Sequence, residues 1–306
     1  MASDTSAPTA RSGALRTLPV VTYKYPQQGL PPISFSDYEP GPLPGGPWQL
    51  TVEPSDIERW ARLFDDDPAE ILAAGSAPPD ILYYPGMNLP APKRDYGGPM
   101  SRYWAEYLGP IPIGEPIELA GAVTEKFLRR GRGGMTFELV ARVGGSVAQR
   151  HWRRFALRLA EGEAEGWAER GSDPRPPEPS PGAEAFGPRL MACTQDRYDD
   201  FEGPGEVTGH TSLEAARAGG HPATTAQGAL SFGLLTRLMR DRFGRRFTED
   251  GTIDVRLVRP TYEGELLAAR GAVLGETDGR LHCRIWAENR AGEPVTTGVA
   301  SVRGGG

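Results

Sequence analysis

Apolar residues recur at helical spacing in one stretch of each half of the chain. Residues 54–72, with Ser55 as the expected N-cap, carry four apolar side chains on one helical face: Ile57, Trp60, Ala61 and Phe64. In residues 226–243 the leucines follow the same period: Leu230, Leu234, Leu235 and Leu238. Because side chains three or four positions apart share a helix face, each half is predicted to contain a helix with one buried face.

Strand-like segments follow each predicted helix, and those of the two halves match each other. Residues 110–123 and 260–273 both begin with proline, contain a Gly-Glu pair in register and end in Gly-Ala-Val. A glycine-containing turn and a second strand-like run follow each of them, at residues 135–143 and 281–288. Such turns between alternating strands are typical of an antiparallel meander. The sequence therefore predicts a duplicated α+β fold, a double hotdog, in which two antiparallel sheets each wrap a long central helix.

A proline-rich stretch separates the matching halves. Residues 173–182 read Asp-Pro-Arg-Pro-Pro-Glu-Pro-Ser-Pro-Gly, and proline lacks the amide donor that helices and interior strands need. The stretch is predicted to be an extended linker. The predicted organisation is a largely disordered arm and lead-in at residues 1–47, a first half at 48–160, the linker at 161–187 and a second half at 188–303.

Composition narrows the expected partners. Hydrophobic residues make up 38% of the chain, charged residues 24%, and the net charge is −6. Nucleic acid and membrane surfaces select basic proteins, so neither is an expected partner. The two cysteines, Cys193 and Cys283, belong to no metal-binding pair, and the chain has no Gly-x-Gly-x-x-Gly motif, so no disulfide framework, metal or cofactor is expected. Residues 1–16 contain no apolar run, which favours a cytoplasmic protein over a secreted or anchored one.

A stretch of the second half resembles the active site of the MaoC-like hydratase/dehydratase family. Residues 210–228 run from a histidine to the glycine that opens the predicted long helix, and read His-Thr-Ser-Leu-Glu-Ala-Ala-Arg-Ala-Gly-Gly-His-Pro-Ala-Thr-Thr-Ala-Gln-Gly. Residues 258–302 are similar to the family's closing strands, with Arg-Pro-x-x-x-Gly-Glu near their start and Gly-Val-Ala-Ser-Val at their end.

The first half resembles the N-terminal hotdog of two-part members of this family, such as mesaconyl-CoA-type and R-specific enoyl-CoA hydratases. The motifs that carry this resemblance are Asp56-Ile-Glu-Arg-Trp-Ala and Pro99-Met-Ser-Arg-Tyr-Trp-Ala. Together the resemblances cover roughly residues 48–160 and 188–303. They are more specific for the fold than for the reaction.

The resemblance implies addition of water to a 2-enoyl thioester, or loss of water from a 3-hydroxyacyl thioester, carried by CoA or an acyl carrier protein. This reaction needs a base, and donors that hold the enolate oxygen. His210 is implied as the base, because imidazole titrates near neutral pH. Gly228 is implied as the donor, because a helix N-terminus presents free N–H groups and a favourable dipole. Thr208, Thr225 and Gln227 are expected to contact the substrate around them.

The chain departs from the family pattern five residues before His210. Relatives have an aspartate there, in Asp-x-Asn-Pro-x-His, whereas this chain has Gly205 within Gly-Glu-Val-Thr-Gly-His. Glu206 lies one residue closer and is the candidate catalytic replacement; the alternative is a solvated loop carboxylate. The alternative hypothesis for His210 is that it is a loop histidine without a catalytic role.

The first half is expected to shape the acyl-binding tunnel. Tyr84 is a candidate substrate-binding residue there, and the alternative is plain core. Five basic residues are candidates for gripping a pantetheine phosphate or an acidic carrier protein: Lys93, Arg94, Arg129, Arg130 and Arg132. His151, within Arg-His-Trp-Arg-Arg, is predicted to lie on a solvated charged face, and His221 is expected to form a pocket wall.

The leading hypothesis is a cofactor-independent hydro-lyase. Two alternatives stay open: an isomerase or cyclase of the same fold acting on a specialised metabolite, and a non-catalytic acyl-binding subunit. Two halves in one chain already supply a pair of hotdogs, so a monomer and a homodimer are both consistent with the sequence. The acyl length, the carrier, the direction of the reaction and the pathway do not follow from it.

Overall fold

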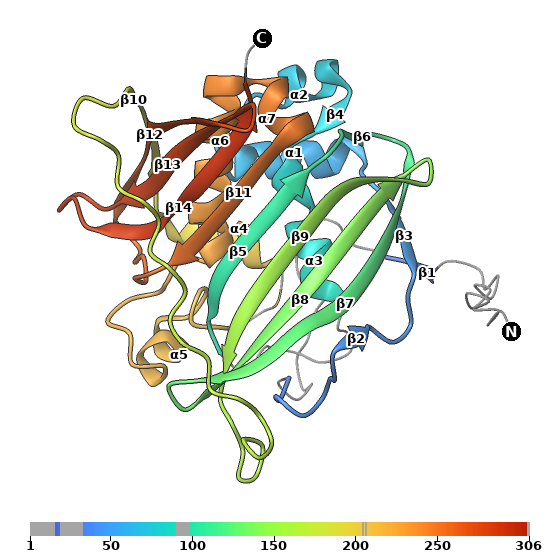
Figure 1. The fold of residues 1–306 in the computed structure, drawn as a ribbon, viewed down its shortest axis with the longest axis vertical. Helices are drawn as coiled ribbons and strands as arrows, with labels where there is room; N and C mark the ends of the chain where they lie inside the picture. The colour runs from blue at the N-terminus through green and yellow to red at the C-terminus, as the bar shows by residue number, and fades with distance from the viewer. Residues whose placement is uncertain (1–15, 19–32, 90–97, 204, 206, 305–306) are drawn as a thin grey trace, which may run out of the picture.

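One continuous sheet carries helices on one side and the linker on the other. The computed structural model describes residues 16–18, 33–89, 98–203, 205 and 207–304. Within these ranges twelve strands form one sheet in the order β1-β3-β7-β8-β9-β5-β11-β14-β13-β12-β10, with β2 paired to β7 (Figure 1). The first half supplies β1 (Arg16–Thr17), β2 (Gly41–Pro42), β3 (Trp48–Thr51), β5 (Met100–Tyr107), β7 (Pro116–Arg129), β8 (Arg132–Val143) and β9 (Ser146–Leu157). The second half supplies β10 (Ala185–Ala192), β11 (Gly251–Leu257), β12 (Leu266–Thr277), β13 (Arg280–Glu288) and β14 (Pro294–Arg303).

The helices lie together behind the sheet in Figure 1. They are α1 (Pro54–Arg62), α2 (Pro68–Ala74), the 3-10 helix η1 (Pro79–Leu82), α3 (Tyr83–Asn88), α4 (Gln195–Glu202), α5 (Leu213–Ala218), α6 (Gly228–Phe243) and α7 (Arg245–Asp250). A small second sheet joins β4 (Ser76–Ala77) to β6 (Ile111–Pro112). In the part of the chain that the structure describes, no helix is both long and apolar enough to cross a membrane.

The strand order repeats in the two halves, as the matching sequence segments predict. Reading outward from the β5–β11 pair, β9, β8, β7 and β3 on one side correspond to β14, β13, β12 and β10 on the other. The register shift in β7 between Val123 and Glu125 has its counterpart in β12 between Val273 and Gly275. Antiparallel pairing of β5 with β11 fuses the two expected sheets into one. The α+β double hotdog expectation is therefore confirmed.

Helix α6 is the centre of the core. Its residues from Ala229 to Met239 are all buried, which is the pattern of a helix enclosed on every side. The ring of Phe232 lies 4.0 Å from that of Tyr103 on β5. The second-half helix therefore packs against the first-half sheet as well as its own, and the two halves share one hydrophobic core.

The helix expected over residues 54–72 is instead two helices, α1 and α2. The backbone of Asp65 is left-handed, with φ of 57°, and Asp67 caps α2 by accepting a hydrogen bond from Ala69 N at 2.8 Å. Pro68 suits the first position of a new helix, because its missing N–H has no partner there. The N-cap of α1 is Glu53 rather than the expected Ser55.

The short η1–α3 segment contacts α6 and is held by an arginine of β9. Its carbonyls receive two hydrogen bonds from Arg153 Nη2, at 3.1 and 2.9 Å. Arg153 is 1% exposed, and its guanidinium fills the space where a Cβ on Gly86 would lie. The described first-half segments thus place an arginine beneath a short helix, where a long central helix was expected.

The prediction of a solvated face around His151 is wrong. His151 is fully buried and Arg154 is 4% exposed. The hydroxyl of Tyr103 donates to His151 Nδ1 at 2.6 Å, and Nε2 lies 2.8 Å from Gln149 Oε1. The alternation of a strand sends neighbouring residues to opposite faces: His151 and Arg153 lie on the inner face, and Arg154 lies on the outer face, where the linker supplies Asp173.

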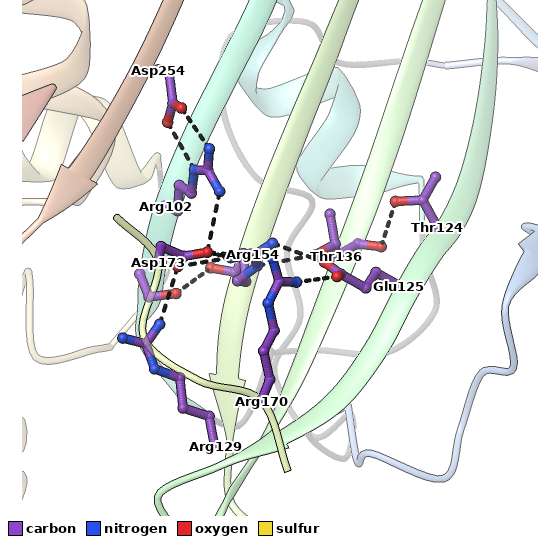
Figure 2. Close-up of polar contacts among 10 residues, drawn as sticks. Arg102, Thr124, Glu125, Arg129, Thr136, Arg154, Arg170, Asp173 and Asp254 are labelled. Carbon is purple, nitrogen blue, oxygen red and sulfur yellow. Dashed lines mark hydrogen bonds and ion pairs between the residues drawn. The ribbon is translucent and has the colours of Figure 1, made fainter. Parts of the chain in front are cut away.

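The linker crosses the outer face of the sheet, in front of the strands in Figure 1. Four guanidinium groups converge on the carboxylate of Asp173 at N···O distances of 3.1 to 3.6 Å: those of Arg102, Arg129, Arg154 and Arg170 (Figure 2). Trp167 packs edge-on against Phe35 with 5.4 Å between ring centroids. The linker is therefore extended but fastened to the sheet, through Asp173 and through the ion pair of Arg170 with Glu125 on β7, while Trp167 packs against the lead-in segment at Phe35.

Candidate functional site

His210 lies in the loop between α4 and α5, with its ring held in one orientation. Its Nδ1 is 2.7 Å from the carbonyl oxygen of Thr225 and 3.3 Å from the hydroxyl of the same residue. A carbonyl oxygen only accepts hydrogen bonds, so Nδ1 carries the proton. In the neutral ring the lone pair is then on Nε2, which is the arrangement of a histidine prepared to accept a proton.

Hydrogen bonds within the loop fix its course around His210. The hydroxyl of Thr208 accepts from His210 N at 3.1 Å, and Thr208 N donates to the hydroxyl of Thr211 at 3.1 Å. Thr225 N donates to the Gly209 carbonyl at 3.0 Å. The structure therefore shows Thr208 and Thr225 shaping the loop, and their contact with a substrate stays a prediction.

The N-terminus of α6 begins at Gly228, three residues after the main-chain partner of His210. A helix start leaves its first N–H groups without intrahelical acceptors, and the helix dipole favours negative charge there. A Cβ on Gly228 would overlap the side chain of Leu257. Glycine thus lets the first turn of α6 approach β11 closely, while its amide remains suited to hold an oxyanion.

Gln227, the N-cap residue of α6, holds the last turn of α4. Its Nε2 donates to the Tyr198 carbonyl at 3.1 Å and to Glu202 Oε2 at 3.0 Å. Gln227 is 5% exposed, and its Oε1 is buried with no hydrogen-bond partner among the described residues. A buried acceptor beside the helix start is consistent with the predicted substrate contact, which no contact in the structure tests.

Two functional candidates escape sequence reasoning. Glu202 is fully buried next to Gln227, and Gln195 binds the main chain of His210, with Nε2 at 2.9 Å from its carbonyl. Both belong to α4, and both precede the histidine motif. Nothing in their spacing distinguishes them from ordinary residues of a polar helix, so only the fold reveals them.

A cavity of about 680 Å³ borders the His210 loop. Its described lining includes three carboxylates and one guanidinium among small loop residues: Arg59, Asp196, Asp199, Asp200, Gly203, Gly205, Val207 and Thr211. His210 lies outside that set. Glu206, the predicted carboxylate partner, lies outside the described residues. Within the described ranges, no group of three or more His, Cys, Asp or Glu side chains is placed to hold a metal ion.

Tyr84 lies in the aromatic core of the first half. It is 1% exposed, and its hydroxyl donates to the Phe201 carbonyl at 2.5 Å. Burial, and then the nearby charge of Glu202, raise the pKa of Tyr84 well above its usual range. Its position favours the core alternative, and a substrate-binding role stays an unsupported prediction.

The candidate phosphate-binding residues are scattered. Arg129 is engaged by Asp173 at 3.1 Å, and Arg130 and Arg132 are exposed at the β7–β8 turn. Lys93 and Arg94 lie outside the described residues. His221 Nδ1 is 3.5 Å from the Tyr262 hydroxyl, in the segment leading to α6, and its role as a pocket wall stays a prediction.

No protein-family model matches this sequence, and no curated protein is similar to it. Solved structures do resemble it. A MaoC-like dehydratase is 15% identical with a TM-score of 0.67, over 87% of this chain and 97% of that one. A conserved hypothetical protein from Mycobacterium tuberculosis with a double hotdog fold is 12% identical with a TM-score of 0.57, over 89% and 97% of the two chains. A putative oleoyl thioesterase from Lactobacillus plantarum is 11% identical with a TM-score of 0.55, over 89% and 99%. At such low identities the likeness concerns architecture, and on that ground the chain has the double hotdog fold of the MaoC-like dehydratases.

Proposed function

We propose that this chain adds water to a 2-enoyl thioester, or removes it from a 3-hydroxyacyl thioester, as a hydro-lyase that uses protein groups alone. The observation that carries the proposal is the tethering of His210 Nδ1 to the segment that leads into the N-terminus of α6. This arrangement supplies a proton acceptor and an oxyanion site from one short stretch of chain. The thioester would be carried by CoA or an acyl carrier protein.

The proposed hydration needs one base and one oxyanion donor. His210 Nε2 takes a proton from water while the water oxygen forms a bond to C3 of the enoyl group. The C2–C3 π electrons shift towards the thioester, whose oxygen becomes an enolate oxygen held by the N–H of Gly228. The imidazolium then returns its proton to C2, and the thioester carbonyl re-forms. Gln227 Oε1 accepts the second hydrogen of the attacking water. Dehydration is the same sequence in reverse.

Loss of the enoyl-thioester absorbance band tests the proposal directly. Wild-type protein mixed with crotonyl-CoA, and with a longer 2-enoyl-CoA, should remove the band. His210→Ala should slow this at least about 100-fold, the usual contribution of a general base. His282→Ala, the same change on β13 of the same half, is the matched control and should keep wild-type activity. Equal rates for wild type and His210→Ala would refute the assignment of the base.

A second candidate function is acyl binding without turnover. The observation that favours it is Gly205, which stands where the resembled family has its aspartate. In that case no enoyl-CoA loses its band, while the protein still binds a non-reactive acyl-CoA, and His210→Ala leaves the affinity nearly unchanged. The cytoplasmic location and the monomer or homodimer state remain predictions beside either function.

A further inference from the structure

We infer that helix α4 is the positioning element of the proposed site. Gln195 in its first turn holds the His210 loop, and Glu202 in its last turn holds the start of α6 through Gln227. The inference rests on the proposed function and adds two positioning residues to it.

Gln195 joins three segments with one side-chain amide. Nε2 donates to the His210 carbonyl at 2.9 Å and to Asp199 Oδ1 at 2.7 Å, and Oε1 accepts from the hydroxyl of Thr224 at 2.7 Å. A flipped amide would turn Oε1 towards two acceptors, so the orientation is determined. The bond to Thr224 reaches the neighbour of Thr225, whose carbonyl holds the imidazole. Gln195 therefore fixes both the main chain of His210 and the partner of its ring.

Glu202 sets the orientation of the side-chain amide of Gln227. Its carboxylate and the Tyr198 carbonyl are both acceptors, and both face Gln227 Nε2. They hold the amide with Nε2 towards α4 and therefore direct Oε1 away from it. Oε1 is the atom that the proposed mechanism uses to accept a hydrogen of the attacking water. Loss of the Glu202 acceptor would release one of the two bonds that define this direction.

Helix α4 is itself fastened to the first half of the chain. Arg197 donates to the Leu63 carbonyl at 2.6 Å and to Asp65 at 2.9 Å. The ring of Phe201 lies 4.8 Å from that of Tyr84. The anchors come from the α1–α2 loop, where Leu63 is buried and Asp65 is exposed, and from Tyr84 of α3 in the core. Support of this kind around a reacting group is what makes its geometry reproducible.

Substitutions at the two ends of α4 test the inference. Gln195→Met removes all three bonds at constant size, and Gln195→Glu keeps the shape but turns both donated bonds into contacts between acceptors. Glu202→Ala removes the acceptor for Gln227, whereas Glu202→Gln retains one. We expect kcat to fall about 10- to 100-fold in Gln195→Met, Gln195→Glu and Glu202→Ala, the usual effect of losing a supporting hydrogen bond. KM should change less than about threefold, because no substrate contact is removed.

The conservative variant separates positioning from chemistry. Glu202→Gln should keep kcat within about threefold of wild type, since its side-chain oxygen still accepts from Gln227. A fall as deep as that of Glu202→Ala would overturn the positioning role, because it would mean that the charge or the proton of Glu202 is needed. Gln49→Met on β3 and Glu58→Ala on the exposed face of α1 are the matched controls and should match wild type.

The tautomer of His210 gives a readout that does not depend on turnover. With four histidines in the chain, the His210 ring nitrogens can be assigned in ¹⁵N spectra by comparison with His210→Ala. Wild type should show the form protonated on Nδ1, and Gln195→Met should show a mixture of the two neutral forms. If wild type hydrates no thioester, the proposed function fails, but a changed tautomer in Gln195→Met still supports positioning by α4. An unchanged tautomer, or unchanged kcat in both Gln195→Met and Glu202→Ala, overturns it.

Discussion

Replacing Asp173 by asparagine would take one negative charge from the point where four guanidinium groups converge (Figure 2). The Asp173 side chain is 8% exposed and that of Arg154 is 5% exposed. Arg154 would keep Glu125 as a partner at 2.8 Å, so its charge would be only partly compensated. The other three arginines are more accessible to water and would recover part of their hydration. The linker would lose the Asp173 anchor and keep the ion pair of Arg170 with Glu125 on β7.

The magnitude follows from how deeply each pair is buried. Breaking a buried ion pair costs about 3–5 kcal/mol, and an exposed pair contributes about 0–1 kcal/mol. One buried arginine that retains a second partner, together with three partly exposed arginines, gives a loss of about 3 kcal/mol in the free energy of unfolding. At about 2 °C per kcal/mol for a chain of this size, the melting temperature should fall by about 6 °C.

Thermal melting followed by circular dichroism measures this loss, and limited proteolysis reports whether the linker detaches. Asp278→Asn is the matched control: Asp278 is exposed in the β12–β13 turn with φ of 53°, which asparagine also adopts. Its melting temperature should stay within about 1 °C of wild type, since exposed substitutions shift stability little. A fall in melting temperature in Asp173→Asn that is no larger than in the control would refute the reasoning. It would show that the four arginines do not need the Asp173 carboxylate.

The same anchor should make stability depend on pH. Burial by itself raises the pKa of Asp173, but the charges of Arg154 and Arg102 outweigh it and lower the pKa overall. Because the pKa of Asp173 is lower in the folded protein, its stabilising effect is complete above the pKa of the unfolded state, near 3.9. The effect is lost as the pH falls through the pKa of the folded state. The difference in melting temperature between wild type and Asp173→Asn should therefore be constant near neutral pH and shrink in acid below about pH 4. A difference that grows in acid would contradict this sign.

Two further predictions concern the packed interior. Gly86→Ala should destabilise the protein by about 1–3 kcal/mol, since its Cβ would overlap the buried guanidinium of Arg153. Gly109→Ala is the control, because the atom nearest to its Cβ would be 3.9 Å away. Equal melting temperatures of the two variants would argue against the overlap. Burial raises the pKa of Cys193 and of Cys283 to about 11, so neither thiol of the native protein should react with a thiol reagent at pH 8 until denaturant is added. Rapid reaction of either thiol without denaturant would contradict that burial.

The duplication could be predicted because it depends on residues that share a local role. Proline, the Gly-Glu pair and the Gly-Ala-Val ending recur with the same spacing because they belong to the same turn and the same strand in each half. The register shifts directly follow the last residue of that repeat in each half, Val123 and Val273. Patterns set by neighbours in the chain are visible in the sequence. They are sufficient to identify the fold class, whereas His210 is a candidate because its stretch resembles the active site of a known family.

Features set by distant partners could not be predicted in this way. Asp173 occurs among prolines, and the strands that supply three of its four arginines, Arg102, Arg129 and Arg154, lie far from it in sequence. A charged run such as residues 150–154 predicts a solvated surface unless something covers it, and here the η1–α3 segment covers Arg153 while the linker contacts Arg154. Glu202 and Gln195 meet their partners only when α4 docks beside the start of α6. Docking of this kind has no signature in spacing or composition.

His151 of the first half and His210 of the second half differ in burial and in the hydrogen bonds of their rings. His151 has both ring nitrogens occupied, by the Tyr103 hydroxyl and by Gln149 Oε1. Burial, and then the charge of Arg153, hold its pKa well below the usual value, so the ring stays neutral and saturated with hydrogen bonds at physiological pH. His210 is half-buried beside a cavity, and its Nδ1 bond to Thr225 directs the lone pair to Nε2. His151 is therefore a neutral hydrogen-bonding group of the core, whereas the tautomer of His210 agrees with its proposed role as the base.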